Sequence, residues 1–342
     1  HYEKMLSENA GLLAVLLKAY GATGQEVFRR TAEETAAFIS RTLSDGEGRF
    51  FGSQDADEEY YLLDAAGRKG LFPPPVDRTV YTGDAARAAA AFLQAGAALG
   101  RDGLTRQGLA ALAFLWEECF REGEGMAHYH DGAPRRWGLL DDGVSMALAL
   151  ARAYGYTGDG DYRERAEKLL RQVLSDHWDE GGGILLDTAP SRLLPALEPE
   201  PAELAGYARA AEAMLALWVL GGEEEWRDHA RRVLEGASVK WASYGVLAAP
   251  YAAAVNLYLR GPLLVRVAGG EDEKLGPFLR AAALSPRPGV MPVIVPEKGI
   301  IEGSEDAEVC GPEACFLRAT DAVELATFLK VEGSLIKGGQ AG

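Results

Sequence analysis

The sequence predicts a mainly α-helical protein, an (α/α)6-type toroid of helical hairpins that ends in a small C-terminal α/β subdomain. The first reason is a module of two helices joined at a glycine, which recurs at Gly21, Gly100, Gly155 and Gly221. In each copy, apolar residues of the second helix fall at positions 0, +4, +7, +8 and +11, which form one stripe of an α-helix. Because one hairpin cannot bury such a stripe alone, neighbouring copies must stack.

The second reason is a contrast between the two helices of each module. The first helix is alanine-rich and apolar on most faces, whereas the second carries apolar residues on one stripe only. Two concentric layers explain this contrast, since only the outer layer of a ring meets water. The module repeats about every 60 residues, as expected for a toroid.

The ring is predicted to span residues 1–260. Its inner helices are expected over 5–20, 84–99, 142–154, 203–220 and 242–259, with Gly21 as a left-handed cap of the first helix. Asp84 and the pair Asp141 and Asp142 are expected to cap the two helices that they open. Each outer helix leads into a glycine-rich turn and a short strand. Four full hairpins are present, so a six-hairpin ring is incomplete or needs sequence from outside this chain.

A change of pattern at residue 261 predicts a second unit over 261–331. Strands are expected at 263–268, 290–295 and 308–317, and helices at 272–284 and 321–330. This strand–helix–strand order indicates an α/β unit with a partly parallel sheet. Residues 332–342 are expected to form a polar tail.

Composition excludes several classes of partner. The chain has 342 residues, 48% of them hydrophobic, and a formal net charge of −16, which argues against nucleic acid and anionic membrane. No apolar run approaches the ~20 residues of a membrane span. Three cysteines make no disulfide framework, so a reducing cytoplasm is expected. No glycine-rich phosphate loop or Gly-x-Ser-x-Gly turn is present, and we expect no cofactor.

The first candidate site is the acidic stretch after the first short strand. Asp55 and Asp57 are candidate catalytic carboxylates, and Gln54 and Tyr61 are candidate substrate-binding residues. Carboxylates beside aromatic rings can bind sugar hydroxyls or act as acid and base. The alternative is a solvated acidic loop, or a carboxylate that caps a helix.

The second candidate site follows the second outer helix. His128 and His130 alternate along a strand and should share one face, where they can act as an acid–base pair. Two histidines alone do not make a zinc site, so no metal is expected. Asp142 is a third candidate catalytic residue, with helix capping as the alternative, and Trp137 is a candidate stacking surface for a sugar.

Cys310 and Cys315 are candidate redox residues. Four residues separate them, unlike the two of thioredoxin-type sites. Free thiols are the favoured reading, and a strand with a Gly-Pro turn that brings the two sulfurs together is the alternative.

Several motifs resemble the thioredoxin-domain-containing YyaL/spermatogenesis-associated-protein-20 family. They are His1-Tyr2-Glu3-Lys4-Met5-Leu6, Gln54-Asp55-Ala56-Asp57, the helix start at Leu140-Asp141-Asp142 and the terminal cysteine pair. The resemblance implies a toroid similar to N-acylglucosamine 2-epimerases and other sugar-active toroids. It also implies an N-terminal thioredoxin-like domain that this chain lacks.

The resemblance has one departure. After Val80-Tyr81-Thr82 the family usually has an acidic or small residue and then Trp-Asn, whereas this chain has Gly83-Asp84-Ala85. We therefore expect an altered pocket, or a toroid retained only as a scaffold.

Two functions remain open on these grounds. The first is a carbohydrate-processing or carbohydrate-binding toroid, with His1 and Glu3 among the substrate-binding residues of its cavity. The second is a non-catalytic or redox-linked partner module of a thioredoxin-like domain.

Overall fold

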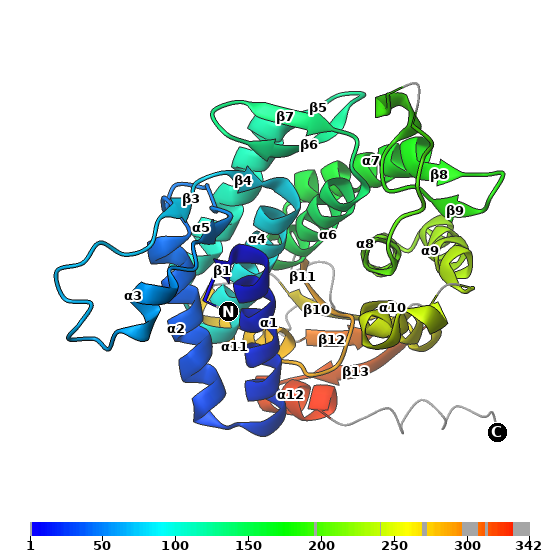
Figure 1. Cartoon of the computed structure of the whole chain (residues 1–342). Helices are drawn as coiled ribbons and strands as arrows, with labels where there is room; N and C mark the ends of the chain where they lie inside the picture. The colour runs from blue at the N-terminus through cyan, green and yellow to red at the C-terminus, as the bar shows by residue number, and fades with distance from the viewer. Residues whose placement is uncertain are drawn as a thin grey trace.

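The fold is an arc of helical hairpins in two layers. The computed structural model describes residues 2–194, 197–239, 241–268, 272–295, 307–311 and 314–330. Within these, the inner layer runs in the order α1 (Leu6–Thr23), α4 (Thr82–Leu99), α6 (Leu140–Thr157), α8 (Leu204–Gly221) and α10 (Ala249–Arg260), each packed on the next. The outer layer consists of α2 (Glu26–Thr42), α5 (Asp102–Phe114), α7 (Gly160–His177) and α9 (Glu224–Ala237) (Figure 1). The predicted α/α toroid is confirmed.

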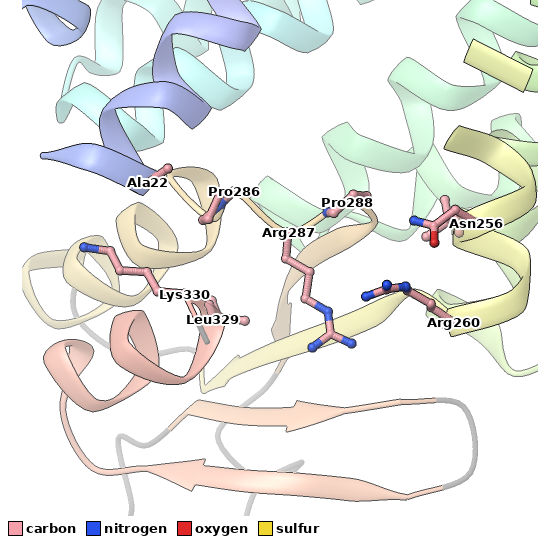
Figure 2. Close-up of a pocket in the computed structure, with 10 residues that line it drawn as sticks. Ala22, Asn256, Arg260, Pro286, Arg287, Pro288, Leu329 and Lys330 are labelled. Atoms are coloured by element: carbon pink, nitrogen blue, oxygen red, sulfur yellow. The ribbon is translucent and has the colours of Figure 1, made fainter. Parts of the chain in front are cut away.

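The arc ends at α1 and α10, and residues 286–288 lie between the C-terminal ends of these two helices (Figure 2). The last inner helix starts later than expected, because residues 241–248 form two short 3-10 turns, Trp241–Ser243 and Gly245–Ala248. No helix in the described part of the chain is both long enough and apolar enough to cross a membrane.

Burial follows the predicted contrast between the layers. In α4 and α8 residues on most faces are buried, whereas α9 buries only one stripe. That stripe consists of Trp226, Ala230, Val233, Leu234 and Ala237. Trp226 is fully enclosed, and burying a large apolar side chain contributes roughly 1.5–3 kcal/mol. The outer helices therefore attach to the ring through their stripes.

Of the glycines of the repeated module, Gly100 is the left-handed cap of α4, but Gly21 does not cap α1 as predicted. The αL cap of α1 is Gly24, and Gly21 lies inside the helix. A Cβ atom on Gly21 would lie 1.7 Å from the carbonyl oxygen of Leu284, and one on Gly155 would lie 2.3 Å from that of Pro292. These glycines let the C-terminal unit approach the backbone of the inner helices.

The C-terminal unit is a mixed sheet with two helices. Its strand order is β11 (Val290–Val295), β10 (Leu263–Ala268), β12 (Ala307–Cys310) and β13 (Cys315–Ala319), with α11 (Asp272–Ala283) and α12 (Ala322–Lys330) packed against it. β10 and β11 are parallel, and β10 and β12 are antiparallel, which confirms the partly parallel sheet. The single strand expected over 308–317 is instead the hairpin β12–β13.

This unit has an apolar core of its own around Val265, Val309 and Leu325. The division of the chain at residue 260 stays a prediction, and the tail at 332–342 lies outside the described residues.

The two ends of the ring differ. Small strands gather at the end where the inner helices begin, which we call the mouth (Figure 1). They are β1 (Lys4–Met5), β2 (Ser53–Gln54), β3 (Val76–Asp77), β4 (Val80–Tyr81), β5 (Phe120–Arg121), β6 (Gly125–His130), β7 (Pro134–Trp137), β8 (Trp178–Asp179) and β9 (Ile184–Leu185), with the short helix α3 (Glu58–Leu62). The opposite end, which we call the floor, is covered by α11 and β11.

Candidate functional site

A histidine–aspartate pair lies at the mouth, where β6 meets the start of α6. His128 Nδ1 is 2.9 Å from Asp142 Oδ2. The other oxygen, Asp142 Oδ1, accepts the backbone N–H of Gly83 at 3.0 Å. Asp142 is only 2% exposed, whereas the His128 side chain is 35% exposed. The carboxylate is therefore enclosed, and the imidazole reaches the solvent side of the pair.

The surroundings of the pair shift the pKa values of both Asp142 and His128. Burial raises the pKa of Asp142 to about 6, against the opposing effect of its hydrogen bond with His128. That hydrogen bond in turn raises the pKa of His128, although partial burial acts the other way. With Nδ1 held by the carboxylate, Nε2 is the ring nitrogen left to exchange a proton with a ligand near neutral pH.

The predicted helix caps are wrong. The N-cap residues of α4 and α6 are Tyr81 and Leu139, and neither helix has a side-chain cap bond. Asp142 instead accepts an amide hydrogen from the first turn of the neighbouring helix α4. A Cβ atom on Gly83 would lie 3.3 Å from Asp142 Oδ1 and 2.9 Å from an oxygen of Asp141. The contact with the two carboxylates therefore accounts for a glycine at this position.

An ionic network joins three inner helices beside this pair. Arg87 Nη1 of α4 donates to Asp141 Oδ2 at 2.9 Å and to Ser145 Oγ at 2.8 Å, both on α6. Arg87 also binds Asp84, and Arg209 Nη2 of α8 lies 2.5 Å from Asp141 Oδ1. Burial alone would raise the pKa of Asp141, but the two guanidinium groups hold it below its usual value. Arg209 Nε is buried without a protein partner.

Further charges lie deeper along the inner helices. Burial and the neighbouring Arg152 lower the pKa of Lys18 on α1. Burial raises the pKa of Glu212 on α8, despite the nearby cations Arg152, Lys18 and Arg209. Sequence reasoning missed this set because it treated the inner helices as apolar on most faces and did not examine their isolated charges. The available signal was an isolated charge within an alanine-rich helix.

The two catalytic carboxylates predicted after β2 lie elsewhere. Asp57 is the N-cap of α3 and accepts the Tyr60 amide at 2.8 Å, and Asp55 accepts the Ala56 amide at 2.8 Å. Helix α3 projects at the left edge of Figure 1, apart from the hairpin β6–β7. Within the described residues, neither carboxylate forms a hydrogen bond or ion pair with His128.

The predicted substrate-binding residues near them serve the same loop. Gln54 is buried and donates to the Pro74 carbonyl at 3.1 Å, and the Tyr61 hydroxyl donates to Gln54 Oε1 at 3.4 Å. Glu3 is exposed one residue before β1. His1 lies outside the described residues.

His128 and His130 do not meet at one centre. His130 packs edge-on against Phe114, with ring centroids 5.2 Å apart, and lines a separate cavity of about 480 Å³. Along β6, His128 therefore contacts Asp142, whereas His130, two residues later, contacts Phe114. The guanidinium carbon of Arg121 lies over the Trp137 ring, 4.5 Å from the ring centroid. The buried Trp137 Nε1 has no hydrogen-bond partner among the described residues.

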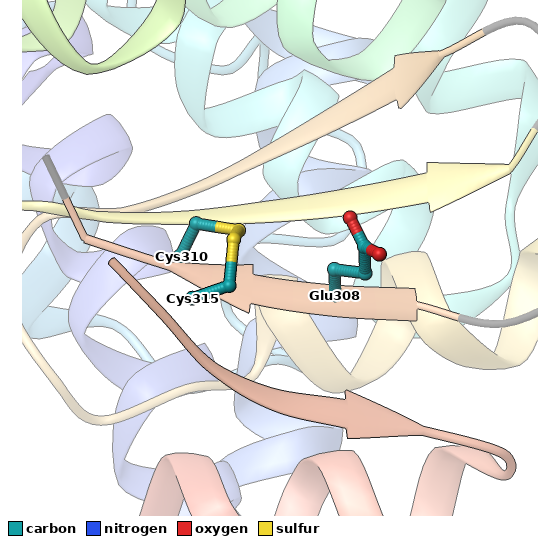
Figure 3. A group of neighbouring side chains, drawn as sticks. All are labelled: Glu308, Cys310 and Cys315. Carbon is teal, nitrogen blue, oxygen red and sulfur yellow. A yellow bond between two sulfur atoms is a disulfide. The ribbon is translucent and has the colours of Figure 1, made fainter. Parts of the chain in front are cut away.

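Cys310 and Cys315 form a disulfide, which corrects the reading that favoured free thiols (Figure 3). The reason is the hairpin β12–β13, whose register places the two residues opposite each other. A Glu308 carboxylate oxygen and the two sulfur atoms lie within 4.8 Å of one another. This is the one such group in the described ranges that has metal-type ligand atoms, and the closed disulfide leaves it no thiolate ligand.

The architecture defines the chain as an α/α toroid similar to several solved enzymes. A sugar epimerase from a ruminal bacterium matches with a TM-score of 0.56 at 14% identity, over 69% of this chain and 61% of its own. Cellobiose 2-epimerase from Spirochaeta thermophila matches with a TM-score of 0.58 at 15% identity, over 71% and 61%. A family 76 glycoside hydrolase from a bovine Bacteroides thetaiotaomicron strain matches with a TM-score of 0.57 at 11% identity, over 96% and 68%. At these identities the likeness concerns the fold.

Sequence relatives are more specific and cover less of the chain. Spermatogenesis-associated protein 20 of Mus musculus is 31% identical over 87 residues, which are 22% of this chain and 11% of the mouse protein. The Rattus norvegicus protein is 37% identical over 57 residues, or 17% and 7%. These matches support the family resemblance. No protein-family profile matches the chain.

Proposed function

We propose that this chain is a carbohydrate-processing toroid that binds a sugar at its mouth, where His128 moves a proton at the carbon next to the sugar carbonyl. The observation that carries the proposal is the enclosed pair of His128 and Asp142, with Nδ1 and Oδ2 2.9 Å apart. A histidine fixed from behind by a buried carboxylate is suited to general acid–base catalysis.

Each residue has a defined part in the proposed step. Neutral His128 takes the proton of the C–H bond at Nε2. The electron pair of that bond forms a C=C bond to the carbonyl carbon, and the π electrons of the C=O bond move to the carbonyl oxygen, which gives an enediolate. Asp142 holds the imidazolium that forms. Arg87 and Arg209 lie beside the pair and supply donors to the developing negative charge. If the enediolate turns its other face to His128 before the proton returns to the same carbon, the product is the epimer. If the proton returns to the former carbonyl carbon, and the proton of the neighbouring hydroxyl moves to the former carbonyl oxygen, the product is the isomer.

Glycoside hydrolysis fits the charges less well. That reaction usually needs two carboxyl groups on either side of the scissile bond. Asp84 and Asp141 are paired with arginines, and Asp142, whose pKa is raised, is enclosed. We therefore favour proton transfer over hydrolysis.

The other predicted site residues would bind the parts of a larger substrate that extend beyond the pair. Within the described part of the chain, none of them forms a hydrogen bond or ion pair with His128 or Asp142, and they are Glu3, Gln54, Asp55, Asp57, Tyr61, His130 and Trp137. Two of the similar solved structures are described as epimerases of sugars, which supports the proposed reaction class.

Calorimetry with a panel of monosaccharides and disaccharides tests the proposal. We expect at least one sugar to bind and His128→Gln to weaken that binding. His229→Gln is the matched control and should retain it, because His229 lies on the outer helix α9, where it pairs with Glu225. If no sugar binds, or if the two variants behave alike, the proposed site is wrong.

The disulfide favours a second candidate function, a redox-linked partner module of a thioredoxin-like domain. Cys315 is exposed on β13, so a partner dithiol can reach its sulfur. In a cytoplasmic location, which stays part of this proposal, the state of the bond would follow the cellular redox balance. Reduced thioredoxin should then open the bond within minutes; a bond that persists argues against this function.

A further inference from the structure

A basic cavity lies at the floor of the ring, at the opposite end from the histidine–aspartate pair. It has a volume of about 290 Å³ and lies between the C-terminal ends of α1 and α10, residues 286–288 and the end of α12. Its polar lining consists of Arg260, Arg287, Lys330 and Asn256. In Figure 2 the side chain of Arg260 extends toward that of Arg287.

The cavity gathers three cations in a chain whose formal net charge is −16. Arg287 is half-buried, whereas Arg260 and Lys330 are exposed at the rim. Within the described ranges, no carboxylate lies within ion-pair distance of Arg260, Arg287 or Lys330, and the cavity lining includes none. Burial and the neighbouring Arg260 lower the pKa of Arg287, as expected for cations held together without a counter-charge.

We propose that this cavity is a binding site for a small phosphate-bearing anion, such as inorganic phosphate or the phosphate group of a small monoester. Guanidinium groups bind phosphate through paired N–H donors, and an ammonium group adds a third positive charge. The volume is at the lower end of ligand pockets, which span roughly 300–1,000 Å³, so a small molecule fits better than a dinucleotide.

The cavity walls are fixed in ways that favour a formed site. Pro286 and Pro288 flank Arg287 and restrict the backbone on both sides. The Arg287 amide also donates to Ser285 Oγ at 3.2 Å. An anion bound here would contact the last inner helix and the C-terminal unit at once, so its binding should stabilise the fold by mass action.

Calorimetry and thermal unfolding of the full chain with inorganic phosphate test this site, at constant ionic strength set with chloride. We expect saturable binding and a phosphate-dependent rise in Tm. Arg287→Gln and Arg260→Gln should each raise the Kd at least tenfold, and Arg287→Lys should recover part of the loss. Arg106→Gln is the matched control, because Arg106 is an exposed arginine of α5 away from this cavity, and it should bind as the wild type does.

Two further measurements identify the anion that binds and test whether its site is separate from the mouth. A hexose monophosphate that binds at least as tightly as phosphate supports a monoester ligand, and binding of phosphate alone supports the free ion. Tighter binding of citrate than of either phosphate compound would overturn the phosphate assignment. His128→Gln should leave phosphate binding unchanged, so failure of the sugar proposal would not affect this one. Absence of saturable binding, or equal binding by Arg287→Gln and wild type, would overturn the proposal.

Discussion

The interaction between His128 and Asp142 can be measured by a double-mutant cycle of His128→Gln and Asp142→Asn. The two side chains share one charge-assisted hydrogen bond of 2.9 Å. Hydrogen bonds to charged groups contribute roughly 1.5–3 kcal/mol, and the 35% exposure of His128 places this one at the lower end. We therefore expect a coupling free energy of about 1.5 kcal/mol.

The coupling should depend on pH in a bell shape. Because the folded-state pKa of His128 is raised, its contribution to stability is present below the unfolded value and is lost as pH rises through the folded value. Asp142 titrates at about 6, and protonation below that pH removes the negative partner. The coupling should thus be largest between about pH 6 and the raised pKa of His128.

Urea unfolding of the four proteins at several pH values between 5 and 9, approximately, provides the assay. The Asn side chain can still accept the Gly83 amide hydrogen, so the Asp142→Asn protein should remain folded. A coupling below about 0.3 kcal/mol at its maximum, or one that does not change with pH, would refute this account of the pair.

Three other predictions follow from the packing. Gly83→Ala should lower the free energy of unfolding by about 1–3 kcal/mol and reduce sugar binding, while Gly103→Ala, in a helix with open space, should not destabilise; equal urea midpoints would contradict this. Gly155→Ala should cost about 3 kcal/mol or more, because its Cβ atom meets a backbone carbonyl of β11; an unchanged Tm would show that this contact is absent. Thiol titration in denaturant should find one thiol before reduction and three after it, because Cys310 and Cys315 are bonded; three thiols before reduction would exclude the bond.

Much of the architecture could be predicted from periodicity. The stripe that includes Trp226 and the contrast between the layers depend only on which face of a helix is buried, and local spacing encodes that. The strands 263–268 and 290–295 were also predicted with their observed bounds. The role of Gly21 could not be predicted, since it depends on a carbonyl group more than 260 residues away in sequence.

The candidate site shows the same limit. Sequence reasoning selected His128 and Asp142 separately, and for Asp142 it offered a cap of its own helix as the alternative to a catalytic role. The hydrogen bond to Gly83 joins residues 59 positions apart and exists only because α4 and α6 pack side by side. The arginines of the inner helices were missed for a related reason, as their carboxylate partners lie on neighbouring helices.

Solvent hydrogen exchange at the sugar carbon tests the central claim most directly. Aldoses that bind would be incubated with the protein in D₂O, and loss of the C2 proton signal would be followed by NMR. We predict exchange with the wild-type protein and no exchange with His128→Gln. If no sugar that binds loses its C2 proton, or if His128→Gln exchanges as fast as the wild type, the imidazole at the mouth does not perform proton transfer.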